Sequence, residues 1–367
     1  MKISNDFDSH QLIINLSILL SQPTGISNYA NNIFPYLKSL EPTLLTAQNS
    51  SGFKCYPVPN NLTPAQGTKG HLRRLIWTQL QLPQIYKQLK SRLLFSPLPE
   101  APLNSNCRFV VMSHDLIPLR FPKRFSPLIP YHRYYIPQVL EQAQHIVCNS
   151  QATAQDIIDF YQIPASKITP ILLAYDRLHF RPFKEKWSHS QRYFLYVGRH
   201  DPYKNLHRLI AAFARLSNHD EYQLWLAGPI DPRHTPALQT QVAELGITHQ
   251  VKFLNYVPYS ELPKIIYGAI ALVFPSLWEG FGFPVLEAMA CGTPVITSNV
   301  SSLPEVAGDA AILINPHNTA EITDAMQMIA GDLELRSHLS TQGINRAKQF
   351  SWEKTGLATA EVLSRYL

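Results

Sequence analysis

The stretch from residue 271 to residue 298 reads ALVFPSLWEGFGFPVLEAMACGTPVITS, and it combines two apolar runs with a glycine-rich segment. The run Ala271 to Phe274 is apolar and contains a β-branched residue, which predicts a buried strand. We expect a helix to begin near Pro284 and to stop at Gly292, before a second apolar strand, Pro294 to Thr297. The pattern is that of a strand, loop, helix, strand unit, which builds parallel α/β sheets.

Two glutamates, Glu279 and Glu287, flank the loop of this unit. In an open α/β sheet such a loop lies at the carboxyl edge, where ligands bind, and the helix N-terminus offers N–H groups to an anion. The spacing puts Glu279 on the loop and Glu287 near the first helical turn, so both can face one crevice. Carboxylates accept hydrogen bonds from the diols of sugars and riboses, and Gly280 and Gly282 allow close approach of the backbone. The pattern predicts a site for a sugar linked to a phosphate. The alternative is an ordinary connection with Glu279 solvated and Glu287 in an ion pair.

The segment WEGFGFPVLEAMACGTPVI, residues 278–296, resembles the glutamate pair of the retaining glycosyltransferases of family 4. The resemblance implies the GT-B fold, an α/β architecture of two Rossmann-like, doubly wound parallel-sheet domains facing a deep cleft. It also implies that Glu279 contacts sugar hydroxyls and that Glu287 contacts the nucleotide ribose. In that family the intervening backbone contacts sugar and phosphate, which here means Phe281, Gly282 and Phe283.

A second motif, GRHDPYKNL at residues 198–206, follows the apolar strand Tyr193 to Val197. Gly198 permits a tight turn, and Arg199 and Lys204 place two cations near the start of the next helix. Cations and a helix terminus stabilise the charge that grows on a diphosphate leaving group. The motif resembles the diphosphate-binding pair of family 4, and the alternative is that both side chains are solvated. No G-x-G-x-x-G follows the strand, so a dinucleotide is not indicated.

The first half of the chain carries a histidine at a predicted strand end. SHDLIPLRFP, residues 113–122, follows the apolar strand Arg108 to Ser113 and resembles the histidine-bearing loop of family 4. The resemblance makes His114 the active-site histidine; a structural histidine held by Asp115 is the alternative. Gly25 lies in the loop SQPTGIS, where the family has a glycine-rich turn facing the acceptor and the donor phosphates. This chain has a single glycine where the family often has two.

Strands alternating with helices predict a parallel sheet in each half of the chain. We expect an N-terminal, acceptor-binding domain over residues 1–180 and a C-terminal domain for the nucleotide-sugar donor over residues 181–350. Residues 351–367 are expected to form a helix that crosses back onto the first domain. The charged, aperiodic segment 176–191 is the predicted linker, and residues 49–70 are expected to be an irregular loop.

Composition indicates a folded protein, with 45% hydrophobic and 16% charged residues. No apolar run approaches the roughly 20 residues that span a bilayer. The four cysteines lie far apart without a C-x-x-C pair, which fits a reducing cytoplasm. Part of the net charge of +6 lies on a predicted helix, His71 to Leu89, and its flanks. That helix has either a solvated face or a basic patch that attracts anionic lipid head groups at the inner membrane face or a phosphate-bearing acceptor. The excess charge is modest and no basic-aromatic run occurs, so nucleic acid is not an expected partner.

The sequence therefore predicts a retaining glycosyltransferase that moves a sugar from a nucleoside diphosphate to a hydroxyl of a glycan or lipid-linked acceptor. Polysaccharide mannosyltransferases combine similar segments, which favours GDP-mannose weakly. The alternatives are a UDP-sugar or a catalytically silent sugar-nucleotide-binding protein. We expect attack on the same face of the sugar and neither a cofactor nor a metal. Asp6 and Asp8 spell the D-x-D pair of metal-dependent enzymes, but they precede the first strand in a short polar arm.

Overall fold

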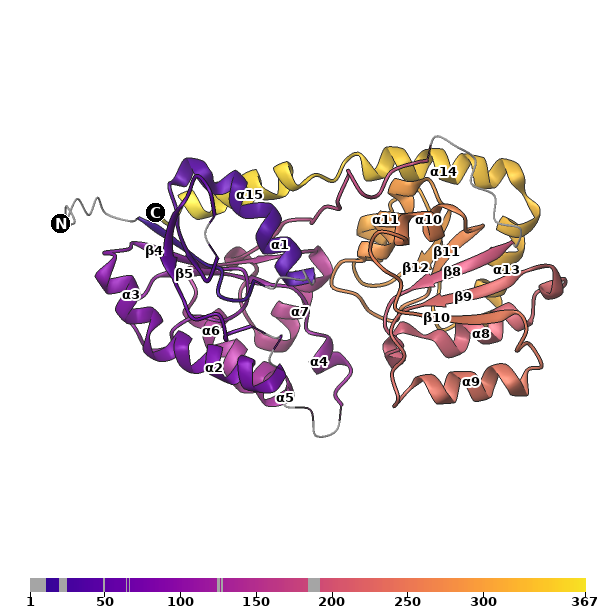
Figure 1. Cartoon of the computed structure of the whole chain (residues 1–367), viewed down its shortest axis with the longest axis horizontal. Helices are drawn as coiled ribbons and strands as arrows, with labels where there is room; N and C mark the ends of the chain where they lie inside the picture. The colour runs from indigo at the N-terminus through magenta and orange to yellow at the C-terminus, as the bar shows by residue number, and fades with distance from the viewer. Residues whose placement is uncertain are drawn as a thin grey trace. The chain divides into compact units, whose positions relative to one another are not determined.

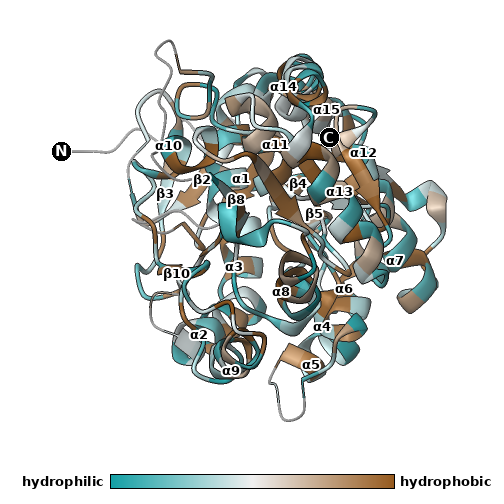
Figure 2. Ribbon diagram, turned by 90° about the vertical axis from the view of Figure 1, so that its right-hand side faces the viewer, coloured by the Kyte–Doolittle hydropathy of each residue, from teal (hydrophilic) through white to brown (hydrophobic). Residues whose placement is uncertain are grey.

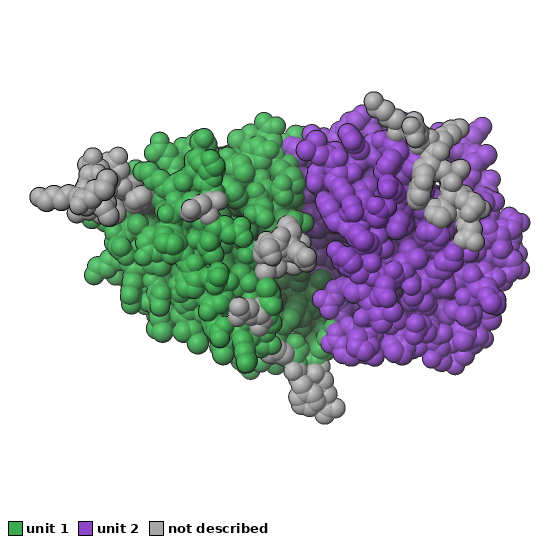
Figure 3. Space-filling model, viewed as in Figure 1, with its two compact units in different colours: residues 1–173, 352–367 green, residues 174–351 purple. Residues whose placement is uncertain are grey.

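The computed structural model describes residues 11–19, 25–48, 50–63, 65, 67–123, 126, 128–183 and 192–367. The chain divides into two compact units (Figure 3): unit 1 comprises residues 1–173 and 352–367, and unit 2 comprises residues 174–351. The first division lies a few residues before the predicted boundary at 180. The described part of the predicted linker, residues 176–183, belongs to unit 2, and residues 184–191 lie outside the described residues.

Unit 1 contains a seven-stranded parallel sheet in the order β3-β2-β1-β4-β5-β6-β7. Most of these strands are buried from end to end, as expected for a parallel sheet covered on both faces. The strands are β1 (Leu12–Asn15), β2 (Thr43–Thr46), β3 (Lys54–Pro57), β4 (Leu93–Ser96), β5 (Phe109–Ser113), β6 (His145–Cys148) and β7 (Ile168–Pro170). The irregular loop predicted for residues 49–70 is wrong at β3 and at residues 67–70, which are helical. Strand β3 escapes sequence patterns because it is a sheet edge, where polar residues and proline are tolerated.

The helical segments of unit 1 follow the predicted pattern with one break. The single helix expected from residue 71 to residue 89 is divided at Gln81, because Pro83 cannot donate the next helical hydrogen bond. The segments are α1 (Gly25–Ile33), η1 (Phe34–Leu40), α2 (Gly67–Leu80), α3 (Leu82–Gln88), α4 (Ile117–Arg120), α5 (Leu128–Pro130), η3 (Tyr131–Tyr135), α6 (Ile136–Gln142), α7 (Gln151–Tyr161), η4 (Ala165–Lys167) and α15 (Trp352–Ser364).

Unit 2 contains a six-stranded parallel sheet in the order β10-β9-β8-β11-β12-β13. Its strands are β8 (Tyr193–Val197), β9 (Gln223–Ala227), β10 (Val251–Asn255), β11 (Ala271–Phe274), β12 (Val295–Ser298) and β13 (Ile312–Ile314). The strands predicted at residues 193–197, 271–274 and 294–297 coincide within a residue with β8, β11 and β12, and apolar strands are brown ribbons in Figure 2. The helical segments are η5 (Pro202–Lys204), α8 (Leu206–Ala214), η6 (His219–Glu221), α9 (Thr235–Glu244), α10 (Leu262–Tyr267), α11 (Phe283–Cys291), α12 (Leu303–Ala307), α13 (Thr319–Gly331) and α14 (Leu333–Ala347).

The strand order of unit 2 reverses at β8, which lies between β9 and β11. The helices α8 and α9 lie on one face of the sheet, and α10 and α11 lie on the other (Figure 1). In doubly wound sheets the crevice at such a reversal, beyond the carboxyl ends of the strands, is where ligands bind. The two motifs singled out in the sequence follow β8 and β11, so the fold brings them to this edge.

The last helix, α15, belongs to unit 1 and packs against α1 and η1. The contact is close, because a Cβ atom on Gly356 would lie 2.5 Å from the Cβ atom of Tyr36. Thr355 Oγ1 donates a hydrogen bond of 2.8 Å to the carbonyl of Leu172. Among the described helices, none has both the length and the apolar character needed to cross a bilayer.

Candidate functional site

A lysine and a glutamate form an ion pair at the carboxyl edge of the unit 2 sheet. Lys204 ends η5, which follows β8, and Glu279 lies in the loop between β11 and α11. Lys204 Nζ donates to Glu279 Oε1 at 2.6 Å, and the two side chains are only 12% and 10% exposed. The rings of Tyr203 and Phe274 have their centroids 5.0 and 5.3 Å from the ammonium group. In such partly desolvated surroundings charges interact more strongly than in water.

Asn205 fixes the turn that carries Lys204. Its backbone has a φ of 63°, and its side chain is fully buried. Asn205 Nδ2 donates to the carbonyls of Pro275 and Pro316 at 3.0 and 2.6 Å. The turn after β8 is thereby tied to the loop after β11, and this tie sets the position of Lys204 relative to Glu279.

The loop that carries Glu279 is held by two serines and enters α11 through a glycine. The backbone N–H of Glu279 donates to Ser301 Oγ at 3.2 Å, and Ser302 Oγ lies 3.0 Å from the Glu279 carbonyl oxygen. Gly282 has a φ of 116°, and a Cβ atom there would lie 2.8 Å from Leu303 Cδ2. Within the described parts of the chain, the N–H groups of residues 281–283 donate to no protein acceptor. They form a helix N-terminus that can receive an anion.

Arg199 lies at the same sheet edge, after a turn at Gly198 that leaves almost no room for added side-chain atoms. Gly198 has a φ of 152°, and a Cβ atom on Gly228 would lie only 1.8 Å from the Gly198 carbonyl oxygen. Tyr196 Oη donates to the Arg199 carbonyl at 2.8 Å, which fixes the backbone of the turn. The Arg199 side chain is 66% exposed, with Nε 3.3 Å from an Asp201 oxygen. The backbone of this turn is therefore rigid, whereas the guanidinium group is in solvent.

Glu287 lies in the second turn of α11 and is protonated at neutral pH. Burial raises the pKa of its carboxyl group to about 8, and the nearby carboxylate of Asp176 adds to the effect. Burial and the same two carboxyl groups also raise the pKa of Tyr259. The His179 ring stacks on Tyr259 at 3.9 Å, and His179 Nε2 donates to the Tyr259 carbonyl at 2.6 Å. The sequence suggested a carboxylate at Glu287, but a neutral carboxyl group can donate a hydrogen bond as well as accept one.

A small cavity opens beside the Gly198 turn. It measures about 250 Å³, and apolar atoms make up most of its wall. It is lined by Val197, Gly198, Arg199, Ala227, Gly228, Pro229, Tyr256, Val257, Tyr259 and Leu262. A flat, apolar ring system attached to a phosphate at the neighbouring strand end would match this combination of shape and lining.

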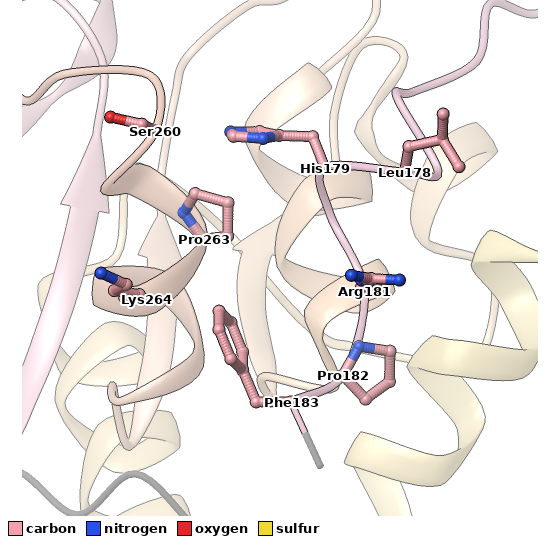
Figure 4. A pocket seen from close by; sticks show the side chains of 8 residues that line it. All are labelled: Leu178, His179, Arg181, Pro182, Phe183, Ser260, Pro263 and Lys264. Atoms are coloured by element: carbon pink, nitrogen blue, oxygen red, sulfur yellow. The ribbon is translucent and has the colours of Figure 1, made fainter. Parts of the chain in front are cut away.

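A second, larger cavity also belongs to unit 2 (Figure 4). It measures about 550 Å³ and lies between residues 178–183 and the start of α10. The residues that line it are Leu178, His179, Arg181, Pro182, Phe183, Ser260, Pro263 and Lys264. Among the described residues of its lining there is no carboxylate, although Lys264 Nζ lies 3.2 Å from Glu261, which does not line the cavity. None of the site residues predicted from the sequence lines this cavity.

His114 and Gly25 belong to unit 1 and are described within that unit. His114 follows β5, and its Nε2 lies 2.9 Å from the carbonyl oxygen of Pro97. A carbonyl only accepts, so Nε2 carries the proton and Nδ1 remains an acceptor. Burial lowers the pKa of His114 to about 4, which makes the imidazole neutral at physiological pH. Gly25 begins α1 and is exposed, and a Cβ atom added there would meet no other atom within 4 Å.

Three side chains of the described residues could together hold a metal ion. Asp201, Asp231 and His234 offer ligand atoms that all lie within 4.8 Å of one another. Arg233 hydrogen-bonds both Asp231 oxygens, at 2.9 and 2.6 Å, and lowers the pKa of that carboxyl group. Arginine pairing is a sufficient reason for these carboxylates to lie together. The D-x-D pair, Asp6 and Asp8, lies outside the described residues.

Four residues that organise the site were not singled out in the sequence: Asn205, Gly228, Tyr259 and Ser302. Gly228 directly follows strand β9, and a glycine at that place signals close backbone approach. The other three act through contacts with residues tens of positions away, such as Asn205 with Pro316. Pattern analysis of a single sequence has no signal for such contacts.

Comparisons with known proteins agree with this arrangement. A family model described as "Glycosyl transferases group 1" matches residues 179–346, and one described as "Glycosyltransferase Family 4" matches residues 23–177. The chain is 32% identical over 272 residues to O-antigen chain mannosyltransferase B of Escherichia coli, covering 71% of this chain and 70% of that protein. It is 30% identical over 332 residues to O-antigen chain mannosyltransferase RfbU of Salmonella typhimurium strain LT2, covering 87% and 90%. HepE of Anabaena, solved in complex with UDP and glucose, matches with a TM-score of 0.75 and 18% identity, over 97% of this chain and all of HepE.

Proposed function

Because the chain belongs to the family 4, group 1 glycosyltransferases of the GT-B fold, we propose that it is a retaining enzyme that uses a nucleoside-diphosphate sugar. Unit 2 would bind the donor and unit 1 the acceptor, a hydroxyl group of a glycan or of a lipid-linked glycan. The observation that carries the proposal is the Lys204–Glu279 pair, which lies beside a helix N-terminus at the strand reversal.

Each part of a sugar nucleotide has a fitting group along this edge. The apolar cavity beside Gly198 suits the base, and Glu287 suits the ribose hydroxyls. The cations of Arg199 and Lys204 suit the diphosphate, together with the N–H groups of residues 281–283. Glu279 suits the sugar hydroxyls, and it already holds Lys204 in place at 2.6 Å.

The proposed reaction proceeds on one face of the sugar. The bond from the anomeric carbon to the phosphate oxygen breaks, and the acceptor oxygen forms a new bond on the same face. The acceptor proton passes to the departing phosphate. Lys204 and Arg199 stabilise the negative charge that grows on that phosphate, so they favour the transition state over the bound substrate.

His114 would contribute from unit 1 as a neutral hydrogen-bond partner of the sugar. Its Nε2 proton is engaged by Pro97, so Nδ1 is the atom offered to a hydroxyl group. With a pKa near 4 it stays uncharged across the physiological range, and we assign it a positioning role.

Mannose from GDP-mannose is the proposed donor, and the two O-antigen mannosyltransferases among the relatives support this choice. A UDP-sugar is the alternative, because HepE was solved with UDP and glucose. We place the protein in the cytoplasm, with a peripheral contact to the inner membrane face.

We also propose that transfer needs neither a metal ion nor a cofactor, because Arg199, Lys204 and a helix terminus can neutralise the diphosphate. If transfer did depend on a metal ion, the ion would have a specific place between Asp201, Asp231 and His234. If a metal acted there, Asp231→Asn would remove activity that chelator also removes.

The deciding experiment measures nucleoside-diphosphate release from a panel of GDP- and UDP-sugars, with chelator present and with a manganese-supplemented control. Release from one donor, lost in Lys204→Ala, is the expected result and identifies the donor. Release only with manganese would contradict metal independence. If no donor is hydrolysed, the acceptor is added as a lipid-linked glycan extract. If that also fails while GDP or UDP still raises the melting temperature, the protein is a silent sugar-nucleotide-binding protein.

A further inference from the structure

The outer face of α2 is both apolar and basic. Its exposed positions recur three or four residues apart, and with 3.6 residues per turn they lie on one side of the helix. Leu72, Ile76 and Leu80 are 57%, 50% and 63% exposed. Lys69 and Arg73 are exposed on the same side. Figure 1 shows α2 along an outer margin of unit 1. We name these five residues the α2 outer face.

The opposite face of α2 already satisfies the fold. Trp77 is buried in the core of unit 1. Arg74, the one buried cation of the helix, donates to both oxygens of Glu100 at 2.7 and 2.8 Å. Tyr131 Oη donates to the same carboxylate at 2.9 Å. The leucines and isoleucine of the outer face are therefore not needed to attach the helix to its unit, and their exposure calls for another explanation.

The stretch of chain that includes α2 carries positive charge and no acidic residue. No Asp or Glu occurs between Glu41 and Glu100. Exposed cations in this stretch are Lys54, Lys69, Arg73, Lys87, Lys90 and Arg92. Beside α2, the segment that follows α5 also exposes Tyr134, at 63%. The partner of this surface must accept apolar side chains and cations together.

We propose that the α2 outer face docks unit 1 on an anionic lipid bilayer. This inference rests on the proposed function in one respect only, that a lipid-linked acceptor would lie in the same bilayer. Leu72, Ile76 and Leu80 enter the headgroup region, and Lys69 and Arg73 pair with lipid phosphates. The long stems of both cations can lie along the apolar boundary while their charges stay in water. A second copy of the chain is a poorer partner, because the same cations would face each other and repel.

The test is co-sedimentation of the full-length protein with vesicles of phosphatidylcholine, with and without phosphatidylglycerol. The wild-type protein is expected to bind only the anionic vesicles, and more weakly as salt increases. Leu72→Ser with Ile76→Ser should weaken partitioning roughly ten-fold or more, and Lys69→Glu with Arg73→Glu should do so at least as strongly. The matched controls change equally exposed residues elsewhere. Leu357→Ser replaces a leucine that is 54% exposed on α15, and Lys38→Glu with Lys348→Glu repeats the charge change. Both should bind as the wild type does.

Three results would overturn the proposal: no binding by the wild type, equal binding to neutral vesicles, or α2 variants that bind as well as their controls. Sedimentation velocity in the absence of lipid shows whether the face joins two copies instead, since the apolar variant would then lose a dimer. Circular dichroism shows whether the variants are folded. Donor hydrolysis keeps the two proposals separate, because the α2 variants should keep it in full. Vesicle binding without any transferase activity would contradict the proposed function alone.

Discussion

The ammonium group of Lys204 and the carboxylate of Glu279 neutralise each other at 2.6 Å, within a site that is mostly closed to water. A charge left without its partner in such a place is strongly disfavoured. Removal of either residue therefore affects both donor binding and the stability of unit 2. A charge-reversed pair separates these two effects.

We expect Lys204→Ala and Glu279→Ala each to lower transfer at least about 100-fold, as loss of a transition-state contact commonly does. Lys204→Glu combined with Glu279→Lys should regain much of the lost stability, because an ion pair can form again. It should not regain activity, since the cation then lies on the wrong loop. Lys264→Ala, which breaks an exposed pair with Glu261, is the control. Wild-type rates in both single variants would remove this site assignment.

Glu287 gives the stability of the protein a pH dependence. Its pKa is about 8 in the folded protein against the ordinary value of 4.5. Between these values the folded state binds more protons than the unfolded state, so the free energy of unfolding falls as pH rises. The loss is complete a little above pH 8 and amounts to at most about 5 kcal/mol. Glu287→Gln should flatten denaturant-measured stability over this window. An unchanged pH profile would show that Glu287 is ionised at neutral pH.

At the scale of elements, the glycine after β9 is the most constrained position near the site. A Cβ atom on Gly228 would lie 1.8 Å from the Gly198 carbonyl oxygen, and backbone cannot yield as a flexible side chain can. Gly228→Ala should therefore destabilise unit 2 by roughly 3 kcal/mol or more and weaken GDP or UDP binding, since the Gly198 turn must move. Gly331→Ala is the control, because nothing lies within 4 Å of its added Cβ. Chemical denaturation and nucleotide titration of both variants test this. Equal stability would mean that the two turns can separate freely.

Helices and strands were predictable from the sequence where a single local pattern defines them. Strands β8 and β11 are apolar runs bounded by turn residues, and their predicted bounds match the structure. Edge strand β3 was not predictable, because an edge does not require apolar residues. The sequence also identified the loops that carry Lys204 and Glu279, but their 2.6 Å contact depends on Asn205 reaching two distant carbonyls. The pKa of Glu287 is raised chiefly by burial and also by Asp176, which lies near the start of unit 2, and neither cause leaves a pattern in the sequence.

At the scale of the whole molecule, two units with separate cores should respond separately to ligand. Apart from Gly25, the groups proposed to contact the nucleotide belong to unit 2, so saturating GDP or UDP should raise chiefly the unfolding transition of that unit. A ligand at one hundred times its dissociation constant adds about 2.7 kcal/mol. Differential scanning calorimetry with and without nucleotide tests this prediction. Hydrogen exchange then assigns each transition, and equal protection of β1 and β8 by nucleotide would contradict it.

Unit 1 is built from two separate pieces of chain, since α15 returns to pack on α1 and η1 after all of unit 2 has been laid down. On a ribosome, the nascent chain exposes α1 and η1 long before the helix that packs on them exists. Unit 2 is one continuous stretch of chain, so it can fold while unit 1 still lacks residues 352–367. The first unit to be synthesised is thus the last to be completed, and during that interval the surface that α15 will cover is open to chaperones.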